Sequence, residues 1–403
     1  MSTLSERILG AEAGAYVDRK VDRAYAHDGT GVLALEAWKQ MGGARLGKET
    51  EYYLQFDHIA PANNSMTAGL QHELRAFAQK TSMHFSDIGC GICHQLMSEG
   101  VVLPGEIVVG ADSHSVTPGA FGAFATGVGA TDMAAIWLTG ETWFRVPESV
   151  GINLTGRLSG AAEAKDLALT YVARLGMDGA TYQALEFVGE GAHHLIIDER
   201  LVLSNLSMEA GAKAGLFYAD DVTVRYLKER GHTVLPQEPE ACSYTKEIDI
   251  DLADIVPLVA VPPRVDTVKP VNDLAGLPLD QVFVGTCTNG RYSDLARFAR
   301  LVKGRKVAVR TIVVPASEEI LKKAIQTGVL ADIVESGCTI GTPGCGPCLG
   351  YHMGVLGEGE VCLSTANRNF KNRMGVGGEI YLGSVATAAA GALAGEITSP
   401  EAA

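Results

Sequence analysis

The chain has 403 residues, more than one ordinary hydrophobic core holds, so two or three domains are expected. Its formal net charge is −14, from 33 basic and 47 acidic side chains, and it lacks the clustered lysines and arginines of a non-specific nucleic-acid binder. Residues 1–33 lack the apolar core of a secretory signal, and the longest small-apolar run, 384–395, is too short to span a bilayer. A cytoplasmic protein is therefore expected.

Short apolar strands alternate with helical patterns along the chain, which predicts an α/β fold with helices covering a mainly parallel sheet. On the first long predicted helix, Leu70, Leu74 and Phe77 form the apolar face. The predicted elements, in chain order, are strand 51–58, helix 65–81, strand 106–114, strand 281–290, helix 293–302, one or two strands in 306–317, helix 318–330 and a tightly packed terminal helix in 384–395.

Two changes of pattern suggest domain boundaries. Near Pro147 a helical pattern gives way to a new strand, and residues 250–270 contain four prolines and are predicted to form a connector. We expect three domains, over residues 1–148, 149–256 and 257–403.

Polar side chains follow three of the predicted strands. Parallel sheets bind ligands at the carboxyl ends of their strands, so these side chains mark a predicted site. They are Asp57-His58, Asp112-Ser113-His114 and Cys287-Thr288-Asn289.

Cys345 and Cys348 form a C-x-x-C motif in a loop rich in glycine and proline. A disulfide is not expected in a reducing compartment, and a thioredoxin-like dithiol would open a helix early in a small domain. A zinc site needs four ligands, usually from two paired motifs, and the other C-x-x-C, Cys90 and Cys93, lies far away in the sequence. Two buried thiols without a metal remain an alternative.

A further alternative joins this pair to Cys287. Three cysteines can hold a 4Fe–4S cluster by three of its irons. The fourth iron is then open, and it can act as a Lewis acid on a hydroxyl and a carboxylate.

Five motifs occur in one order along nearly the whole chain: FDHIAPANN, GICHQ, VVGADSHSVTPGAFGAFATGVGATDMA, GTCTNGR and GCGPCLGYHMGVLGEGEVCLSTANRNFKNRMG. With them the chain resembles the aconitase superfamily, most of all the large subunits of its two-subunit members. These are 3-isopropylmalate dehydratase, homoaconitase and 2,3-dimethylmalate dehydratase. The resemblance implies three α/β/α-layered domains around a central cluster, without the family's swivelling fourth domain.

By this resemblance, Cys287, Cys345 and Cys348 are the ligands of a 4Fe–4S cluster with one iron that no cysteine binds. Cys338 and Cys362 match no ligand position and are interpreted as packing residues.

The resemblance also implies residues for proton handling, a task for which paired carboxylates and imidazoles are suited. Asp57 and His58 match the pair that protonates the leaving hydroxyl, and His94 and Asp112 match a second pair. His114 completes the DSH motif.

Glu209 is expected to contact His114, and Asn205 lies four residues before Glu209, on the same face if the segment is helical. An ordinary exposed helix face is the alternative for Asn205 and Glu209.

Substrate-binding residues are implied as well. Arg368 and Arg373 would grip substrate carboxylates with their planar guanidinium groups, which explains how an acidic protein binds a dianion. His27, Ser113 and Asn205 match further substrate-contacting positions. The alternatives are solvated surface arginines and a structural histidine beside a glycine-rich turn.

Several features depart from the family pattern. Ser115 and Thr286 replace a Thr and a Ser found in many relatives, and the segment before His27 is shorter. No segment similar to YGSGSSRE is present, although the fourth domain of the family uses such a segment to supply the catalytic serine. A separate small subunit is expected to carry this serine and a further arginine.

The expected function is therefore the cluster-bearing large subunit of a hydro-lyase. It would isomerise 3-isopropylmalate to 2-isopropylmalate in leucine biosynthesis, and homoaconitate, 2,3-dimethylmalate and citramalate are alternative substrates. An iron-responsive RNA-binding protein, a non-catalytic electron-transfer iron–sulfur protein and a structural zinc protein are rival classes.

Overall fold

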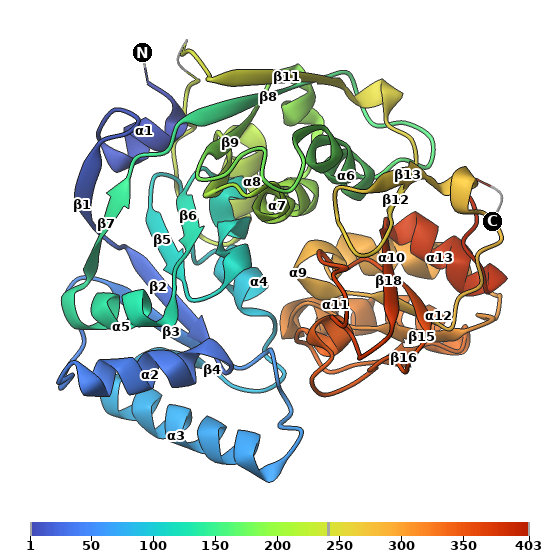
Figure 1. Ribbon diagram of the computed structural model, residues 1–403, viewed down its shortest axis with the longest axis horizontal. Coiled ribbons are helices and arrows are strands. Elements are labelled where there is room, and N and C mark those ends of the chain that lie inside the picture. The colour runs from blue at the N-terminus through green and yellow to red at the C-terminus, as the bar shows by residue number, and fades with distance from the viewer. Residues whose placement is uncertain (1, 240–241, 402–403) are drawn as a thin grey trace. The chain divides into compact units, whose positions relative to one another are not determined.

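The computed structural model describes residues 2–239 and 242–401. The chain separates into two compact units. Figure 1 colours the ribbon by residue number. The first unit takes in the chain up to Asp87, Cys93–Gly156 and Asp178–Asp251; the second takes in Ile88–Ile92, Arg157–Met177 and the chain from Leu252. The three domains expected from the sequence stay a prediction. Within the described residues, no helix is long and apolar enough to cross a membrane.

The first unit contains a five-stranded sheet that is parallel throughout, in the order β4-β3-β2-β5-β6. The chain proceeds from β2 outward through β3 and β4 on one side, and through β5 and β6 on the other. Strand order therefore reverses between β2 and β5, where a crevice opens at the carboxyl edge. The strands are β2 (Arg23–His27), β3 (Glu51–Gln55), β4 (His84–Ser86), β5 (Ile107–Gly110) and β6 (Phe124–Gly127).

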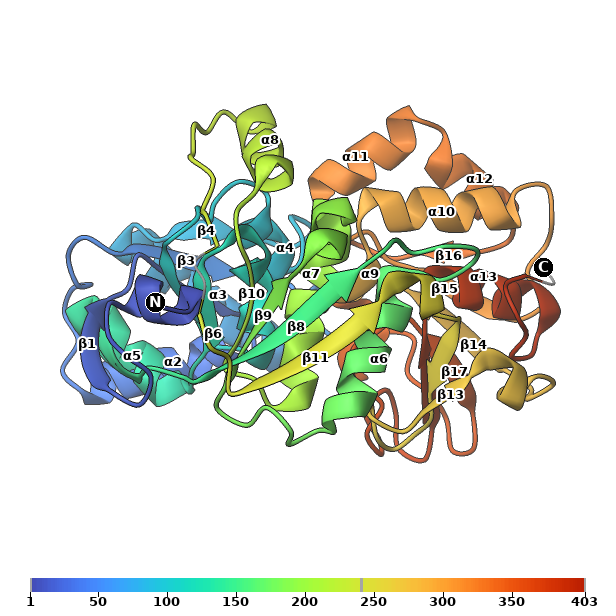
Figure 2. The same cartoon turned by 90° about the horizontal axis from the view of Figure 1, so that it is seen from above.

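A second parallel sheet of this unit has the order β10-β9-β8-β11, and Figure 2 shows β8 and β11 side by side along their length. A separate antiparallel pair joins β1 to β7. These strands are β1 (Tyr16–Lys20), β7 (Glu141–Arg145), β8 (Ser149–Thr155), β9 (Ala184–Val188), β10 (Ala214–Phe217) and β11 (Lys246–Asp251). The sequence predicted a helical pattern up to about Pro147, but Gly140 ends α5 in the left-handed region and β7 follows.

Helices complete the first unit, and α2, α3 and α5 gather together in Figure 1. The predicted helix 65–81 is confirmed as α3, which the Asn64 side chain caps by accepting from Thr67 N. Leu70 does not belong to its buried face, because the helix is exposed or half-buried through Leu70 and burial begins at Gln71. The helices are α1 (Leu4–Leu9), α2 (Thr30–Gln40), α3 (Ser65–Thr81), α4 (Cys93–Ser98), α5 (Ala130–Thr139), α7 (Ile197–Leu206) and α8 (Asp221–Glu229), with 3₁₀ segments η1 (Ser113–Phe121), η2 (Glu190–His194) and η3 (Ser207–Ala210).

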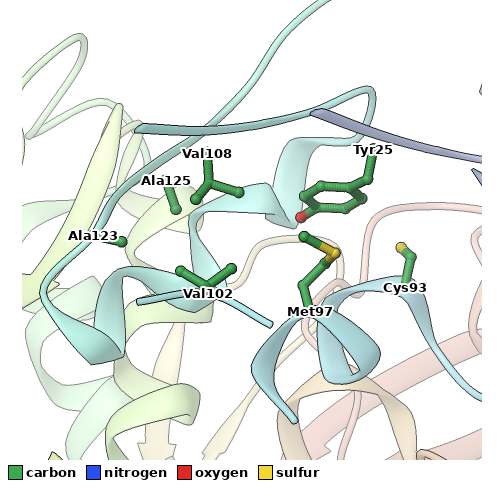
Figure 3. Close-up of a cluster of buried hydrophobic side chains, with 7 residues drawn as sticks. All are labelled: Tyr25, Cys93, Met97, Val102, Val108, Ala123 and Ala125. Carbon is green, nitrogen blue, oxygen red and sulfur yellow. The ribbon is translucent and has the colours of Figure 1, made fainter. Parts of the chain in front are cut away.

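An apolar cluster fixes α4 against the sheet. Figure 3 shows Met97 directed at the ring of Tyr25, and Val102 directed at Val108. Cys93 is fully buried in the same cluster and so packs in the core. Because Tyr25 comes from β2 and Met97 from α4, this contact fixes the helix that carries His94 to the central strand.

The second unit contains a seven-stranded sheet in the order β13-β12-β18-β17-β14-β15-β16, in which β12 alone runs antiparallel to both of its neighbours. Strand order reverses between β14 and β17, as it does between β2 and β5 in the first unit. The strands are β12 (Leu258–Ala260), β13 (Val268–Pro270), β14 (Gln281–Val284), β15 (Arg310–Val313), β16 (Thr339–Ile340), β17 (Val361–Ser364) and β18 (Glu379–Gly383).

Two predictions for this unit need correction. The segment 250–270 was predicted to be a connector, yet it supplies β12 and β13 to the sheet. The predicted helix 318–330 is two helices, because Gly328 adopts a φ of 77° between them. The helices are α6 (Ala164–Leu175), α9 (Thr286–Asn289), α10 (Tyr292–Val302), α11 (Glu318–Gln326), α12 (Val329–Glu335) and α13 (Val385–Ala394), with 3₁₀ segments η4 (Leu252–Asp254), η5 (Val271–Leu274) and η6 (Gly346–Leu349).

The buried side chain of Glu186, in β9, is expected to stabilise the first unit through its hydrogen bonds. Its buried carboxylate accepts from Leu4 N, Ser5 N and Ser149 Oγ at 3.1, 3.2 and 2.8 Å. Glu186→Leu leaves the two peptide N–H groups without an acceptor and is expected to reduce stability by roughly 2–4 kcal/mol, measured by urea unfolding. The exposed Glu190→Leu is the control, and equal effects of the two variants would contradict the expectation.

Candidate active site

Three strands of the first unit end in polar residues at the same sheet edge. His27 is the last residue of β2 and Asp28 follows it, Asp57 and His58 follow β3, and the segment Asp112–His114 follows β5. Because β2, β3 and β5 are neighbours and parallel, their carboxyl ends meet where the strand order reverses.

Asp57 and His58 form a buried ion pair, in which His58 Nδ1 donates to Asp57 Oδ1 at 2.6 Å. Cys93 N donates to Asp57 Oδ2 at 2.7 Å. Burial alone would raise the pKa of Asp57, but the charge and hydrogen bond of His58 lower it to about 2. Burial alone would lower the pKa of His58, but Asp57 raises it to about 9. His58 is therefore an imidazolium at neutral pH, with Nε2–H free of Asp57.

Asp28 holds the turn that carries this pair. Its Oδ1 accepts from His58 N at 2.9 Å, and its Oδ2 accepts from Ile59 N at 2.9 Å and from Gln71 Nε2 at 3.2 Å. The sequence interpretation missed Asp28, and its place directly after a strand end beside His27 was the signal that could have found it. His27, Asp28, Asp57 and His58 lie close enough to bind a metal ion, but the donors on Asp28 already use its oxygens.

His27 stacks on His58 with ring centroids 3.5 Å apart. Gly29 N donates to His27 Nδ1 at 3.1 Å, so a neutral His27 carries its proton on Nε2. This buried Nε2 has no hydrogen-bond partner among the described residues. It lies 3.7 Å from Asp112 Oδ2, and His58 Nε2 also lies 3.7 Å from that oxygen. These distances exceed a direct hydrogen bond, and one hydroxyl or water oxygen can bridge the three groups.

His94 is held from both sides. Its Nε2 lies 2.8 Å from Asp112 Oδ1, and its Nδ1 lies 2.9 Å from the hydroxyl of Tyr25. Burial lowers the pKa of His94 although Asp112 raises it, and the pKa of Asp112 lies well below its usual range because its hydrogen bonds to histidines outweigh burial. Tyr25 was missed in the sequence, where an apolar strand gave no sign that its hydroxyl reaches His94.

The expected contact between Glu209 and His114 is present, with Oε1 and Nε2 2.8 Å apart. Asn205 is fully buried and donates from Nδ2 to Thr117 Oγ1 at 2.8 Å. The two residues do not share one helix face, because α7 ends at Leu206 and Glu209 lies in η3. Both side chains are nonetheless buried, so the alternative of an exposed face is wrong. A substrate contact of Asn205 stays a prediction.

Ser113 is half-buried and lines a cavity of about 640 Å³ at this edge, together with Thr30, Asp112, Val128 and Met208. Through this cavity a small molecule can reach Asp112 and Ser113. A substrate contact of Ser113 stays a prediction.

The second unit has a polar edge of its own. Cys287 follows β14, Cys345 and Cys348 follow β16, and Asn367 follows β17. All three cysteines are buried, with 7–8% of their surface exposed. Asn367 Nδ2 lies 3.4 Å from Cys287 Sγ, and Asn367 Oδ1 lies 4.0 Å from Cys348 Sγ. The strand ends thus bring distant cysteines together around one amide.

The backbone of the cysteine turns is strained and closely packed. Thr286 has a φ of 77°, in the left-handed region that a β-branched residue rarely adopts. Gly346, between Cys345 and Cys348, has a φ of 56°, and a Cβ there would lie 2.9 Å from Val314. Such strain is typical of turns that must aim a functional side chain.

Arg291 supports the Cys287 turn from within the core, since its Nη1 and Nη2 donate to Thr288 O at 2.5 Å and Cys287 O at 2.6 Å. Arg373 is half-buried and donates to Cys348 Sγ at 3.7 Å, and Arg368, next to Asn367, is also half-buried. Neither predicted substrate-binding arginine is a fully solvated surface residue. Their contact with substrate stays a prediction.

The sulfur chemistry separates two kinds of cysteine. Burial raises the pKa of Cys338 to about 11 and that of Cys362 to about 12, which keeps them as thiols and suits packing. Cys287 Sγ instead accepts from Asn367 Nδ2, and Cys348 Sγ accepts from Arg373 Nη2. With Cys345 in the same turn as Cys348, the set fits a metal cluster held by three thiolates.

Comparison with known proteins gives concordant matches. The family model "Aconitase family (aconitate hydratase)" matches residues 5–395. The chain is 53% identical over 386 residues to the probable methanogen homoaconitase large subunit of Methanosarcina mazei, covering 94% of this chain and 98% of that protein. It is 44% identical over 411 residues to 3-isopropylmalate dehydratase large subunit 1 of Methanopyrus kandleri, covering 99% and 98%. It is also 44% identical over 419 residues to the methanogen homoaconitase large subunit of Methanocaldococcus jannaschii, covering 98% and 99%.

The crystal structure of aconitase X from Thermococcus kodakaraensis, in its holo form, matches with a TM-score of 0.53 over 87% of this chain and 84% of that one. At 12% identity this likeness concerns the fold alone. It agrees with the α/β architecture of several parallel sheets.

The pairing of His58 with Asp57 predicts an unusual titration. Because the pKa of His58 is raised from 6.5 to about 9, its contribution to stability is complete below pH 6.5 and is lost as pH rises through about 9. Asp57→Asn is expected to lower the pKa of His58 by at least about two units and to remove this pH dependence. Histidine NMR titration measures the pKa, with the exposed His72 as internal control. A wild-type His58 that titrates near 6.5 would contradict the assignment.

Proposed function

The chain belongs to the aconitase family, and from this we propose that it is the cluster-binding large subunit of a hydro-lyase. We propose that it acts with a small subunit on a hydroxy acid that bears two or three carboxylates. The three domains and the cluster-centred arrangement expected from the sequence are part of the same proposal.

The observation that carries the proposal is the meeting of Cys287 and Cys348 around the Asn367 side chain, at distances of 3.4 and 4.0 Å. Cys345 lies in the turn of Cys348, so three thiolates are available at one sheet edge. They would hold a 4Fe–4S cluster by three irons, and the remaining iron would supply Lewis-acid chemistry to a bound hydroxyl and carboxylate.

The chain's own residues would handle the proton on the leaving oxygen. His58 is an imidazolium at neutral pH, and Asp57 fixes its tautomer, so Nε2–H is the proposed proton donor to the hydroxyl that leaves. His27 Nε2–H and Asp112 Oδ2 would hold that oxygen beside His58 Nε2 during the transfer. The same three groups would orient the water that adds back to the alkene.

The remaining site residues would position these groups and the substrate. His94 holds Asp112 and is itself held by Tyr25, and Glu209 holds His114. Arg368 and Arg373 would bind substrate carboxylates. The base that removes the C–H proton would come from the small subunit, which would supply a serine and a further arginine.

Two substrates have the strongest support. The first is 3-isopropylmalate, because its isomerisation in leucine biosynthesis is the commonest role expected of such large subunits. Homoaconitate is the second candidate, because the highest identity among the relatives above, 53%, is with a probable homoaconitase large subunit, against 44% with a 3-isopropylmalate dehydratase.

Anaerobic reconstitution with iron and sulfide tests the proposal. The chain is expected to bind about four irons alone and to turn over only when its small subunit is added. Alkene absorbance with 3-isopropylmalate, homoisocitrate, 2,3-dimethylmalate, citramalate and citrate identifies the substrate. A chain that binds no cluster, or a loaded complex inactive with every acid, would overturn the proposal.

His58→Gln is expected to lower kcat by about 10²–10⁴-fold, because it removes the proposed general acid, while iron content stays unchanged. The matched control is His193→Gln, since His193 pairs with Asp220 at 2.7 Å but is exposed. Equal turnover of the two variants, measured by alkene absorbance in the loaded complex, would exclude His58 as the proton donor.

A further inference from the structure

Lys165 is a fully buried cation in the second unit that the proposed chemistry does not use. It lies in the first turn of α6, with 0% of its surface exposed. Its ammonium donates to Thr365 O at 2.8 Å and to Ala366 O at 2.6 Å, just after β17 ends. Both acceptors are neutral carbonyl oxygens, so these bonds leave the positive charge uncompensated.

No carboxylate among the described residues lies within ion-pair distance of Lys165 Nζ. The neighbouring Asp166 is itself buried, and burial raises its pKa to about 8, so it supplies little negative charge at neutral pH. Burial also lowers the pKa of Lys165 to about 7, while nearby negative charge, first of Cys287 and then of Asp294, opposes that effect. An isolated buried charge is costly and calls for a partner.

The segment that Lys165 holds is the one that reaches the cysteines. Thr365 O also accepts from Thr288 Oγ1 at 2.6 Å, which joins this segment to the Cys287 turn. Two residues further on, Asn367 contacts Cys287 Sγ and Cys348 Sγ. Arg368 follows directly. A shift of the Thr365–Ala366 carbonyls would therefore move the amide that contacts two of the three thiols.

We propose that Lys165 is a positioning residue for the three-cysteine site, and that its buried ammonium is the fixed counter-charge of the anionic cluster bound there. The inference rests on the proposed function, because it assumes that Cys287, Cys345 and Cys348 act as thiolate ligands. Three thiolates bring more negative charge than the core of a 4Fe–4S cluster neutralises. A cation fixed behind the ligands stabilises that excess and tunes the reduction potential of the cluster.

Removing the Lys165 charge should have opposite effects on the chain without the cluster and on the chain that holds it. Lys165→Met removes a buried charge that has no partner without the cluster, so the melting temperature of the apo-chain should stay equal or rise. In the loaded chain the same variant should lose iron to a chelator about tenfold faster and shift the cluster midpoint potential to a more negative value. A role confined to holding two carbonyls would instead lower the stability of both forms.

Two further variants separate charge from hydrogen bonding. Lys165→Gln keeps an N–H donor but carries no charge. Its cluster midpoint potential and its rate of iron loss to a chelator should match those of Lys165→Met. Lys213→Met is the control, because Lys213 is half-buried and likewise donates to a backbone carbonyl, Gly127 O, at 3.2 Å in the other unit. It should leave both cluster properties unchanged.

The outcomes that overturn the inference are distinct from failure of the proposed function. Wild-type iron retention and potential in both Lys165 variants would overturn it, as would a Lys165→Met apo-chain that melts lower or fails to fold. A wild-type chain that takes up no iron–sulfur cluster would overturn the proposed function itself, and this inference with it.

Discussion

The geometry of the site depends on one constraint, which is that parallel strands end at the same edge of their sheet. In both units the chain adds strands outward from a central strand, first on one side and then on the other. The chain segments that leave the two central strands therefore lead to opposite sides of the sheet. In the first unit this constraint gathers His27, His58 and Asp112 from three strand ends. In the second it gathers Cys287 and Cys348 from the ends of β14 and β16, the two strands that flank β15. Residues that are far apart in the sequence become neighbours in this way.

Many of the hydrogen bonds made by charged side chains buried at these edges go to backbone groups. Asp28 accepts from peptide N–H groups, while Arg291 and Lys165 donate to peptide carbonyls. A side chain held in this way cannot move without breaking several bonds to the main chain, so the strand-end turns are held in fixed positions. Asp57 and His58 combine this support with ionic pairing, which is why their pKa values move in opposite directions.

The sequence predicted the α/β class, the helix 65–81 and the strand ends that carry the polar residues. These features follow from hydrophobic periodicity, which burial on one face imposes directly. The strand before Pro147 and the strands in 250–270 were not predicted, because both are short and neighbouring strands decide their pairing. Tyr25, Asp28, Arg291 and Lys165 were missed for a related reason. Tyr25, Asp28 and Lys165 act through hydrogen bonds to residues distant in sequence, which no spacing pattern encodes. Arg291 bonds to carbonyl oxygens only three and four residues before it, but no pattern in the sequence marks this arginine as buried. The contacts of His94 and His114 were foreseen only through family resemblance.

Thr286 shows what this arrangement demands of the chain. A β-branched residue at a φ of 77° stores roughly 1–3 kcal/mol of conformational strain directly before Cys287. Glycine would adopt this backbone without strain and would release that energy, yet it would also free the turn that aims the thiol. The position is therefore one where selection for thermal robustness and selection for a rigid ligand turn oppose each other. A stabilising substitution at Thr286 would therefore exchange activity for stability.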